Sequence, residues 1–594
     1  MSNQSVIKLF EKIVISNYER IAVRDRKDKI TYGELNEKAN RFAHYLLEEK
    51  KVKKGDFIAI SMNRNIDMMI TLLGILKAGC TYIPVDRIYP KKRIDFILND
   101  SRASACIVNK DSKEEYEFHG DLINYDENKY RQYSTENCSI DIEGDDGLYM
   151  TYTSGSTGIP KGVLVWNKSI LNLSKTVEHL FDFSEDSVFI SMTTMTFDIF
   201  VFEALLPLLR GASVVIASHE DQGDIYSLVY LLKQVTVYQS TPSRLAAFLQ
   251  NELVVDSLKN IKTFILGGEP FPMELLKKCR ELFSAQIWNG YGPTECSVYT
   301  SFKNLTDADD ITIGKPVQNS QMYVLDEFRN ECIKGELYIG GACLAKGYWS
   351  REELNKERFI TGQGGNRLYK SGDIVIKRQN GEFEYVGRAD YQVKIRGYRI
   401  ELQEIEEALK KVDGIKKAIV DAQAMLNGEK TLCAYCITSR KIEKEEIINR
   451  LAQSLPEYMI PLHYKFMDSF PLNANGKIDR KAFPLFDFNR KSEEYVAPRN
   501  EIEEEIAQLW QELLNYDKIS IFDDFIDYGG NSLTVVQMAG YLYEVYQIKL
   551  SLASILTEGR TIADLAALVE KVVLDSTDED ELTAMMAELD KASL

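Results

Sequence analysis

Residues 151–162 read Thr-Tyr-Thr-Ser-Gly-Ser-Thr-Gly-Ile-Pro-Lys-Gly, the densest run of phosphate-binding residue types in the chain. Glycines let backbone N–H groups approach an anion closely, while hydroxyls and Lys161 add further donors and positive charge. The G-x-x-x-x-G-K-[ST] spacing of the Walker loop is absent, so that nucleotide-binding fold is not indicated. Taken alone, the segment predicts a phosphate-binding loop, with a polar surface loop as the alternative.

The sequence on both sides of this loop alternates between strand-like and helix-like segments as far as about residue 388. FIAISM (57–62) is strand-like and is followed by helical apolar spacing in IDMMITLLGILKAG. SVVIAS (213–218), VTVYQS (235–240) and TFILGG (263–268) repeat the pattern, with helical stretches between them. This alternation predicts α/β layers of mostly parallel strands, whose carboxyl ends hold ligands.

Smaller units follow this region. Residues 390–486 predict an α+β unit, and the polar segment 487–498, which ends in Ala-Pro after acidic and basic residues, predicts a linker. Residues 499–572 predict an all-helical unit that starts with Asn500 as the cap and Glu503 as in a capping box. The acidic segment 573–594 predicts either a docking helix or a frayed tail.

Composition places the chain among globular proteins and limits its partners. The net charge of −18 over 594 residues argues against nucleic acid or an anionic membrane as a general partner. The nine cysteines are scattered, and the pair Cys433 and Cys436 lacks a second half-site, so we expect strand-core cysteines rather than a metal site. The start of the chain does not resemble a signal peptide, and Met68–Leu76 is too short to span a bilayer, so we expect a cytoplasmic protein.

The loop TSGSTGIPKG resembles that of the adenylate-forming enzymes, which include acyl-CoA synthetases, luciferases and the adenylation domains of nonribosomal peptide synthetases. Further motifs occur in the family's order over nearly all of residues 1–486. They are ITYGELN (30–36), LKAGCTYIPVD (76–86), FDIFVFE (197–203), NGYGPTE (289–295), GELYIGG (335–341), YKSGDI (369–374), GRADYQVKIRGYRIELQEIE (387–406), LPEYMIP (455–461) and NGKIDR (475–480). The resemblance implies an α/β adenylate-forming fold with a large core at 1–389 and a small mobile α+β subdomain at 390–486.

The segment DDFIDYGGNSL (523–533) resembles the attachment site of peptidyl carrier proteins. The resemblance implies an all-α four-helix carrier domain in which a phosphopantetheinyl transferase attaches 4′-phosphopantetheine to Ser532. Asn531 stands where that family often has His or Asp, which puts the choice of transferase or partner in doubt.

The resemblance also assigns roles at a nucleotide site. Lys477 would bridge the α-phosphate of ATP and the substrate carboxylate, Glu295 would bind Mg²⁺, and Asp373 would accept hydrogen bonds from the ribose. Such a site must hold two anions together, which requires cations and aligned donors. ATP contacts are implied for Thr153, Ser154, Gly155, Ser156, Thr157, Lys161, Asn289, Tyr291, Gly292, Thr294, Asp373, Arg388 and Lys477.

Two closures of the small subdomain are implied, one for adenylation and one for thioester formation. Asp390 matches the family's hinge position, and Gly397 should approach the pantetheine tunnel in the second closure. LQEIE (402–406) departs from the commoner LGEIE and puts only the helix start in doubt.

Asp198 is the residue that favours an amino acid, because in the peptide synthetases an aspartate at this place pairs with the α-ammonium of the substrate. A buried cation needs such a partner. Beyond Asp198 and Lys477, the sequence offers no acid or base for a charged substrate side chain. The other implied pocket residues are Ile199, Phe202, Gln239, Ile265, Gly267, Gly290, Val298 and Tyr299. Among them, Gly267 and Gly290 should leave space, whereas Ile199, Phe202, Gln239 and Tyr299 should take it away.

The leading hypothesis is therefore ATP-dependent activation of a small amino acid and its loading on Ser532, for nonribosomal peptide synthesis. Glycine is favoured, followed by alanine or valine. A module for initiation or a stand-alone protein is expected, with a downstream condensation domain or another synthetase subunit as partner and the need for a small activator protein left open. The alternatives are a carboxylate–CoA ligase with a fused helical tail, which Asp198 opposes, and a non-catalytic docking scaffold, which Lys477, Glu295 and Asp373 oppose.

Overall fold

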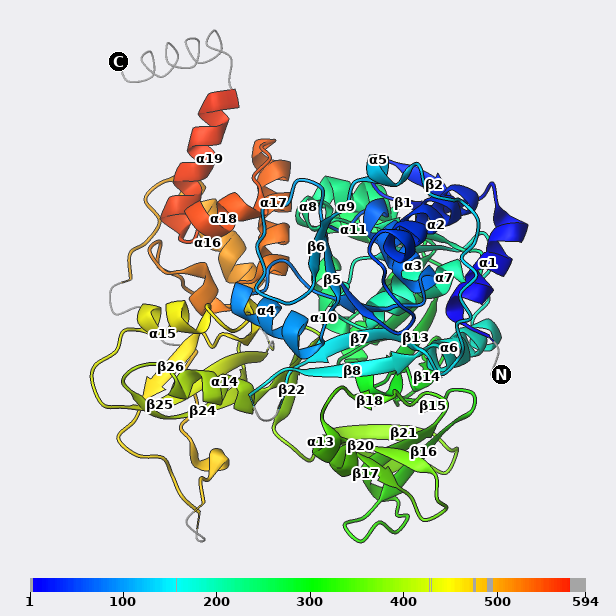
Figure 1. Ribbon diagram of the computed structural model, residues 1–594. Helices are drawn as coiled ribbons and strands as arrows, with labels where there is room; N and C mark the ends of the chain where they lie inside the picture. The colour runs from blue at the N-terminus through cyan, green and yellow to red at the C-terminus, as the bar shows by residue number, and fades with distance from the viewer. Residues whose placement is uncertain are drawn as a thin grey trace.

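The computed structural model describes residues 4–155, 158–426, 428, 430–473, 477–488 and 495–576. Its largest sheet has nine strands, and all pairs from β13 to β1 along it are parallel (Figure 1). In spatial order the strands are β15 (Lys315–Pro316), β14 (Ser301–Asn304), β13 (Gln286–Tyr291), β12 (Thr263–Gly267), β11 (Val237–Ser240), β9 (Val188–Ser191), β10 (Ser213–Ile216), β1 (Ile21–Arg24) and β2 (Lys29–Thr31).

A seven-stranded sheet lies beside the first and is parallel from β7 to β6. Its order is β18 (Gly347–Tyr348), β8 (Lys161–Trp166), β7 (Gly147–Thr153), β4 (Thr81–Pro84), β3 (Phe57–Ser61), β5 (Ala105–Val108) and β6 (Asp121–Asn124). β3, β4 and β5 are almost wholly buried, which explains their largely apolar sequences. The phosphate loop connects β7 to β8, so the sequence quoted first lies at the end of one of these strands.

Helices cover the two sheets. α3 (Ile66–Lys77) is buried along nearly its whole length, and Thr31 and Glu34 form a capping box at the start of α2 (Tyr32–Glu48). The other core helices are α1 (Val6–Asn17), α4 (Lys91–Asp100), α5 (Glu127–Tyr130), α6 (Asn167–Leu180), α7 (Leu206–Leu208), α8 (His219–Gly223), α9 (Ile225–Leu232), α10 (Pro242–Phe248), α11 (Glu252–Leu258), α12 (Met273–Leu282) and α13 (Glu352–Arg358).

A third sheet differs from the expected strand–helix alternation because all of its pairs are antiparallel. It contains β16 (Ser320–Leu325), β17 (Lys334–Gly341), β20 (Arg367–Lys377) and β19 (Phe359–Thr361), with β21 (Phe383–Arg388) also paired to β20. The prediction of mostly parallel strands therefore holds for the interiors of the first two sheets and not for residues 320–388. β20 and β21 carry Asp373 and Arg388 to the site described below.

The small subdomain begins with the β22 (Gln392–Ile395) and β23 (Tyr398–Glu401) hairpin. Its two turn residues, Arg396 and Gly397, have φ values of 51° and 81°, as a tight type I′ turn requires. α14 (Leu402–Lys410) and α15 (Lys444–Leu451) pack with a three-stranded sheet of β24 (Ile415–Ala424), β25 (Lys430–Thr438) and β26 (His463–Phe466). We keep residue 389 as the proposed boundary of the core, since it lies between β21 and β22.

The C-terminal unit has a hydrophobic core of its own. It contains α16 (Glu501–Leu514), α17 (Ser532–Tyr546), α18 (Leu552–Glu558) and α19 (Ile562–Ser576), as the all-helical prediction requires. Asn500 caps α16 as expected, but the Glu503 carboxylate accepts from the N–H of Arg499 rather than from that of Asn500. Residues 489–494 of the expected linker and 577–594 of the acidic tail lie outside the described residues.

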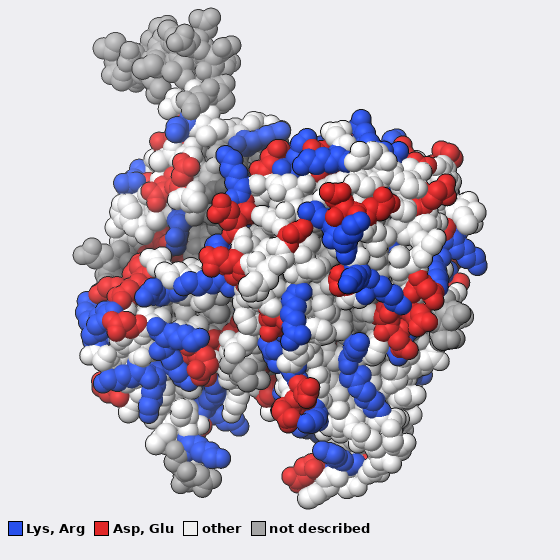
Figure 2. All heavy atoms as spheres, in the orientation of Figure 1, with Lys and Arg blue, Asp and Glu red and all other residues white. Residues whose placement is uncertain are grey.

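Cys433 and Cys436 are both buried in β25, which confirms strand-core cysteines. No group of three or more His, Cys, Asp or Glu suited to a metal occurs in the described part of the chain. Within the same part, no helix combines the length and the apolar character needed to cross a bilayer. On the face shown in Figure 2, acidic and basic side chains are interspersed.

Candidate active site

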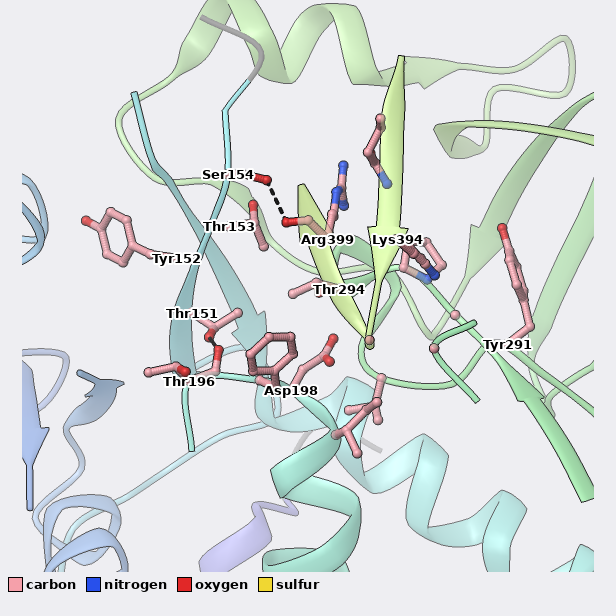
Figure 3. A pocket seen from close by; sticks show the side chains of 18 of the residues that line it. Thr151, Tyr152, Thr153, Ser154, Thr196, Asp198, Tyr291, Thr294, Lys394 and Arg399 are labelled. Atoms are coloured by element: carbon pink, nitrogen blue, oxygen red, sulfur yellow. Dashed lines mark hydrogen bonds between the residues drawn. The ribbon is translucent and has the colours of Figure 1, made fainter. Parts of the chain in front are cut away.

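A pocket of about 90 Å³ lies between the core and the β22–β23 hairpin (Figure 3). The carboxyl end of β7 and the segments after β9 and β13 reach it, as expected for an α/β sheet. The predicted site residues that line it are Thr153, Ser154, Asp198, Ile199, Tyr291, Gly292, Thr294, Val298, Tyr299, Asp373 and Arg388. Ser156 and Thr157 lie outside the described residues.

Asp198 lies at the wall of this pocket as a carboxylate with unused hydrogen-bonding capacity. Its Oδ2 is buried and has no hydrogen-bond partner among the described residues. Burial raises the pKa of Asp198 to about 6. A buried carboxylate of this kind is stabilised by a cation that enters the pocket.

The Tyr299 ring fills the space beside Gly267 and Gly290. A Cβ placed on Gly267 or Gly290 would lie 2.9 or 2.6 Å from the Tyr299 ring. The Tyr299 hydroxyl is hydrogen-bonded to the Gln239 amide at 2.9 Å, and the ring meets Phe202 edge-on at 5.2 Å. The two glycines therefore leave space, and the Tyr299 ring fills it.

The remaining pocket predictions follow from this arrangement. Phe202, Gln239, Gly267 and Gly290 surround Tyr299, and Ile265 lies in β12 beside them, fully buried. None of these five lines the pocket, whereas Ile199 and Val298 do. Val298 has a φ of 74°, which a β-branched residue adopts only under constraint from its surroundings.

A polar network joins the predicted ribose acid to the predicted hinge. The Asp373 carboxylate accepts from the Tyr291 hydroxyl and from Arg388 Nη1, the latter at 2.8 Å. The same guanidinium donates twice to Asp390, at 2.7 Å each. Arg388 therefore holds Asp373 and Asp390 together, beside Tyr291, which is one of the implied ATP contacts. Asn289 is turned away, since its amide donates to Thr312 O at 2.8 Å.

Glu295 is fully buried and paired with the small subdomain. Arg399 Nη1 lies 2.8 Å from its Oε2, and the Tyr348 hydroxyl donates to its Oε1 at 2.6 Å. Burial would raise the pKa of Glu295, but Arg399 and Lys161 outweigh it and lower the pKa to about 2. Burial and the Arg399 charge lower the pKa of Lys161 to about 8. The Lys161 ammonium lies 4.9 Å from the centre of the Tyr348 ring.

The phosphate loop is also engaged by the small subdomain. Ser154 Oγ donates to Arg399 O at 3.0 Å and accepts from Glu401 N at 3.2 Å. The Gly155 N–H donates to Glu404 Oε2 at 3.1 Å, so a carboxylate occupies a donor that the sequence assigned to phosphate. In this closure the hairpin and the start of α14 thus occupy two predicted phosphate donors, Ser154 Oγ and the Gly155 N–H. The hairpin also occupies Glu295, the predicted metal ligand.

Lys477 is not brought to the pocket. It is exposed beside the Leu472–Ile478 bridge, and its N–H donates to Asn473 Oδ1 at 3.1 Å. Lys394 of β22 lines the pocket instead and enters from the side opposite to Asp198 (Figure 3). Burial lowers the pKa of Lys394. This cation could not be predicted from the sequence, because a lysine in a two-stranded hairpin carries no distinguishing pattern.

Two further acids were missed. The Glu203 carboxylate is buried and accepts from the N–H groups of Met192 and Thr193 at 2.8 and 2.9 Å. Glu269 accepts from the Gly397 N–H, which fixes the hairpin turn against the core. A Cβ on Gly397 would lie 2.8 Å from Thr241 Cγ2, so this close approach requires glycine.

The helical unit docks on the core next to this turn. Gln537 of α17 donates to Ala247 O at 2.9 Å, and the Tyr543 ring lies 4.2 Å from that of Tyr226. α10, which carries Ala247, begins just after Thr241, the residue against Gly397. The start of α17 at Ser532 therefore belongs to a unit that contacts the same helix as the hairpin.

Comparisons with known proteins agree with this architecture. The AMP-binding enzyme family matches residues 10–349, its C-terminal domain matches 404–477, and the phosphopantetheine attachment site matches 504–569. Bacitracin synthase 3 of Bacillus licheniformis is 36% identical over 594 residues, which cover 97% of this chain and 9% of that protein. Gramicidin S synthase 2 of Brevibacillus brevis is 36% identical over 578 residues, which cover 96% of this chain and 13% of that protein. The chain thus spans only a small part of the length of each relative.

Two solved structures are similar as well. A holo nonribosomal peptide synthetase protein with adenylation and peptidyl carrier domains, bound to a vinylsulfonamide inhibitor, aligns with a TM-score of 0.80 and 24% identity over 96% of this chain and 97% of that one. A four-domain nonribosomal peptide synthetase bound to AMP and glycine aligns with a TM-score of 0.59 and 30% identity, covering 96% of this chain and 43% of that one.

Proposed function

The chain belongs to the AMP-binding enzyme family, here joined to a phosphopantetheine carrier domain, and we propose that it activates a small amino acid with ATP and loads it on its own carrier. The observation that carries this proposal is the buried, unpartnered Oδ2 of Asp198 at the pocket wall. An α-ammonium is the group that such a carboxylate would bind, whereas fatty and aryl acids offer no cation. The relatives, a bacitracin synthase and a gramicidin S synthase, support the same conclusion.

Glycine is the proposed substrate, and alanine or valine is the next choice. Tyr299 supports this choice because its ring occupies the space over Gly267 and Gly290 where a larger side chain would lie. The similar four-domain synthetase was solved with glycine, which agrees with the proposal. A single methylene changes binding by only ~1–3 kcal/mol in an apolar pocket, so some leakage to alanine is expected.

The roles proposed for the nucleotide residues follow from their surroundings. Glu295 would hold Mg²⁺, which when bound shields the phosphate charges, in a closure where Arg399 has withdrawn from the carboxylate. Asp373, Tyr291 and Arg388 would bind the ribose and orient the adenosine. Lys477 would act in that other closure, with Asp390 as the hinge and the phosphate loop residues 153–161 on the β- and γ-phosphates.

The closure described here suits the loading step. Its hairpin turn lies against α10, on which the carrier unit also docks. Lys394 faces the pocket from which Lys477 is absent. We therefore propose that the Lys394 ammonium neutralises the negative charge on the phosphate of the leaving AMP. Phosphopantetheine on Ser532, installed by a transferase, would supply the thiol, and a condensation domain or another synthetase subunit would receive the product. Use as an initiation or stand-alone module is part of this proposal.

Amino-acid-dependent ATP–pyrophosphate exchange tests the proposal. The full chain is assayed with all amino acids and with fatty and aryl acids, and the pantetheinylated chain is then weighed intact after incubation with ATP and glycine. Exchange with glycine and a mass gain on the holo chain are expected. Exchange with acids that lack an amine would favour a CoA ligase, and no exchange with any acid would favour a docking scaffold.

A further inference from the structure

A second cleft, of about 580 Å³, opens between the two lobes beside the tip of the phosphate loop. Residues 158–160 of the loop form part of its wall, and α4 contributes Lys92 and Arg93. α14 and the residue after it contribute Glu404 and Lys411, and α15 contributes Arg450. Because both lobes supply the walls, the cleft has this shape only in the closure described here.

The cleft is positively charged in a chain whose net charge is −18. Lys92, Lys411 and Arg450 have no ion-pair partner among the described residues, whereas neighbouring Lys410 is paired with Glu407 at 2.7 Å. The one acid in the wall, Glu404, is already paired with Arg93 at 2.8 Å. The unpaired cations therefore give the cleft an excess of positive charge that attracts anions.

Arg93 supplies a buried donor at the base of this charge. Its side chain is 5% exposed, and its Nε has no hydrogen-bond partner in the described part of the chain. A buried guanidinium N–H without a hydrogen-bond partner destabilises the folded protein. An anion or a water molecule in the cleft would supply the missing acceptor. Arg93 also lies over the Tyr89 ring, at 5.5 Å from its centre, and Tyr89 lines the first pocket.

Glu404 links the cleft to the phosphate loop. One of its oxygens accepts from Arg93 and the other from the Gly155 N–H. In this closure a protein carboxylate thus takes a loop donor, while Arg399 takes Glu295. An anion released from the front of the loop could not rebind at the Gly155 N–H, which Glu404 occupies. The cationic cleft next to the loop tip would remain accessible to it.

We propose that this cleft is a product subsite for pyrophosphate, formed when the small subdomain adopts the loading closure. The inference rests on the proposed function for the source of the anion, because pyrophosphate is the second product of adenylate formation. Lys92, Lys411 and Arg450 would neutralise its charge from the rim, and Arg93 Nε would donate to it from the base. A compact anion with several charges fits cations spread over two lobes better than a singly charged one does.

Isothermal titration of the full chain with sodium pyrophosphate, without amino acid or nucleotide, tests the site. The variant Lys411→Gln/Arg450→Gln should bind pyrophosphate about fivefold or more weakly, since it removes two of the unpaired charges in the cleft wall. The matched control Lys410→Gln/Lys441→Gln removes the same charge from paired lysines outside the cleft wall and should change affinity less than about twofold. Equal weakening in both variants, or none in the first, would overturn the proposal.

A front-site variant separates the cleft from the phosphate loop. Lys161→Ala should remove pyrophosphate binding at the front of the loop and leave cleft binding, which Lys411→Gln/Arg450→Gln should then weaken further. Orthophosphate and CoA are titrated as additional arms. Tighter binding of CoA than of pyrophosphate at the cleft would show that the cleft takes phosphate ends of a nucleotide instead and would contradict the assignment.

Amino-acid-dependent exchange, measured on the same variants, keeps the two proposals distinguishable. The control variant Lys410→Gln/Lys441→Gln should retain the exchange activity of the unmodified chain, since its changed residues line neither the first pocket nor the cleft. Failure of the unmodified chain to activate any amino acid would refute the proposed function, while the titrations would still decide whether the cleft binds pyrophosphate.

Discussion

Arg399 of the small subdomain and Glu295 of the core form an ion pair at 2.8 Å, with the Glu295 side chain fully buried. The pair fixes the hairpin to the segment that the family motif assigns to metal binding. Removal of one partner from a buried pair costs about 3–5 kcal/mol, because the other charge stays buried without compensation. The closure described here should therefore depend on Arg399.

Arg399→Gln should slow loading of the carrier at least tenfold and leave adenylate formation within about threefold of normal. The physical reason is that adenylation is assigned to the other closure, in which Arg399 is withdrawn. Single-turnover formation of the loaded chain and hydroxylamine trapping of the adenylate measure the two steps. Arg440→Gln, which removes an exposed ion pair with Glu446, is the control. Equal loss in both steps would contradict the prediction.

Asp198→Asn should lower kcat/KM for glycine by about a hundredfold or more, because the α-ammonium loses its buried partner. In the unchanged chain, KM for glycine should rise as the pH falls below about 6, since the pKa of Asp198 is raised to about 6 and the protonated acid binds ammonium poorly. The variant should lose that dependence. Pyrophosphate exchange between pH 5 and 8 measures both effects, and an unchanged pH profile in the variant would refute the assignment.

Asp198→Asn should lower activity but raise the thermal stability of the protein without substrate. A raised folded pKa means that ionised Asp198 destabilises the fold, and the penalty grows between the unfolded pKa near 4 and the folded value of about 6. Above that range the asparagine variant should melt at a higher temperature than the unchanged chain, and below about pH 4 the difference should disappear. Differential scanning at several pH values checks this sign.

Tyr299→Ala should shift the substrate preference toward larger aliphatic amino acids, because it empties the space over Gly267 and Gly290. Loss of a buried aromatic ring also costs about 3–5 kcal/mol of stability, so Tyr299→Leu provides a milder variant. Exchange across an amino-acid panel measures the shift. Gly267→Ala, which would bring a Cβ to 2.5 Å from Gly290 O, should lower activity with every substrate. An unchanged preference in both Tyr299 variants would exclude Tyr299 as the size filter.

Lys477→Ala and Lys394→Met should affect opposite steps. The first should abolish adenylate formation and spare loading from synthetic glycyl-AMP, while the second should slow loading about tenfold or more and spare exchange. The reason is that each ammonium faces the substrate in only one closure. Stopped-flow loading and exchange assays separate the steps, and a parallel loss in both variants would contradict the division of roles.

Tyr226→Ala should slow loading severalfold, since it removes the ring contact with Tyr543 that holds the carrier on α9. Tyr230→Ala is the matched control, because Tyr230 lies on the same helix and is 58% exposed. Adenylate formation should be the same in both variants. A loading rate unaffected by Tyr226→Ala would mean that the docking seen here does not limit transfer.

The strands of the two parallel sheet interiors could be predicted because burial on both faces gives short apolar runs, as in FIAISM and TFILGG. The order of motifs also located the pocket wall at Asp198, Tyr291 and Asp373. The antiparallel sheet at 320–388 carried no such signal, because its strands mix buried and exposed positions irregularly and vary in length. The roles of Lys394 and Glu404 depend on contacts between distant segments, which periodicity does not record.

The short segment between β21 and β22, residues 389–391, has a kinetic consequence. Because so few residues join the lobes, the effective concentration of one lobe near the other is high and does not depend on the protein concentration. Opening and closing are therefore first-order events within one molecule. Diluting the protein should leave the rate per molecule unchanged, whereas lobes supplied as separate chains would slow down in proportion to dilution.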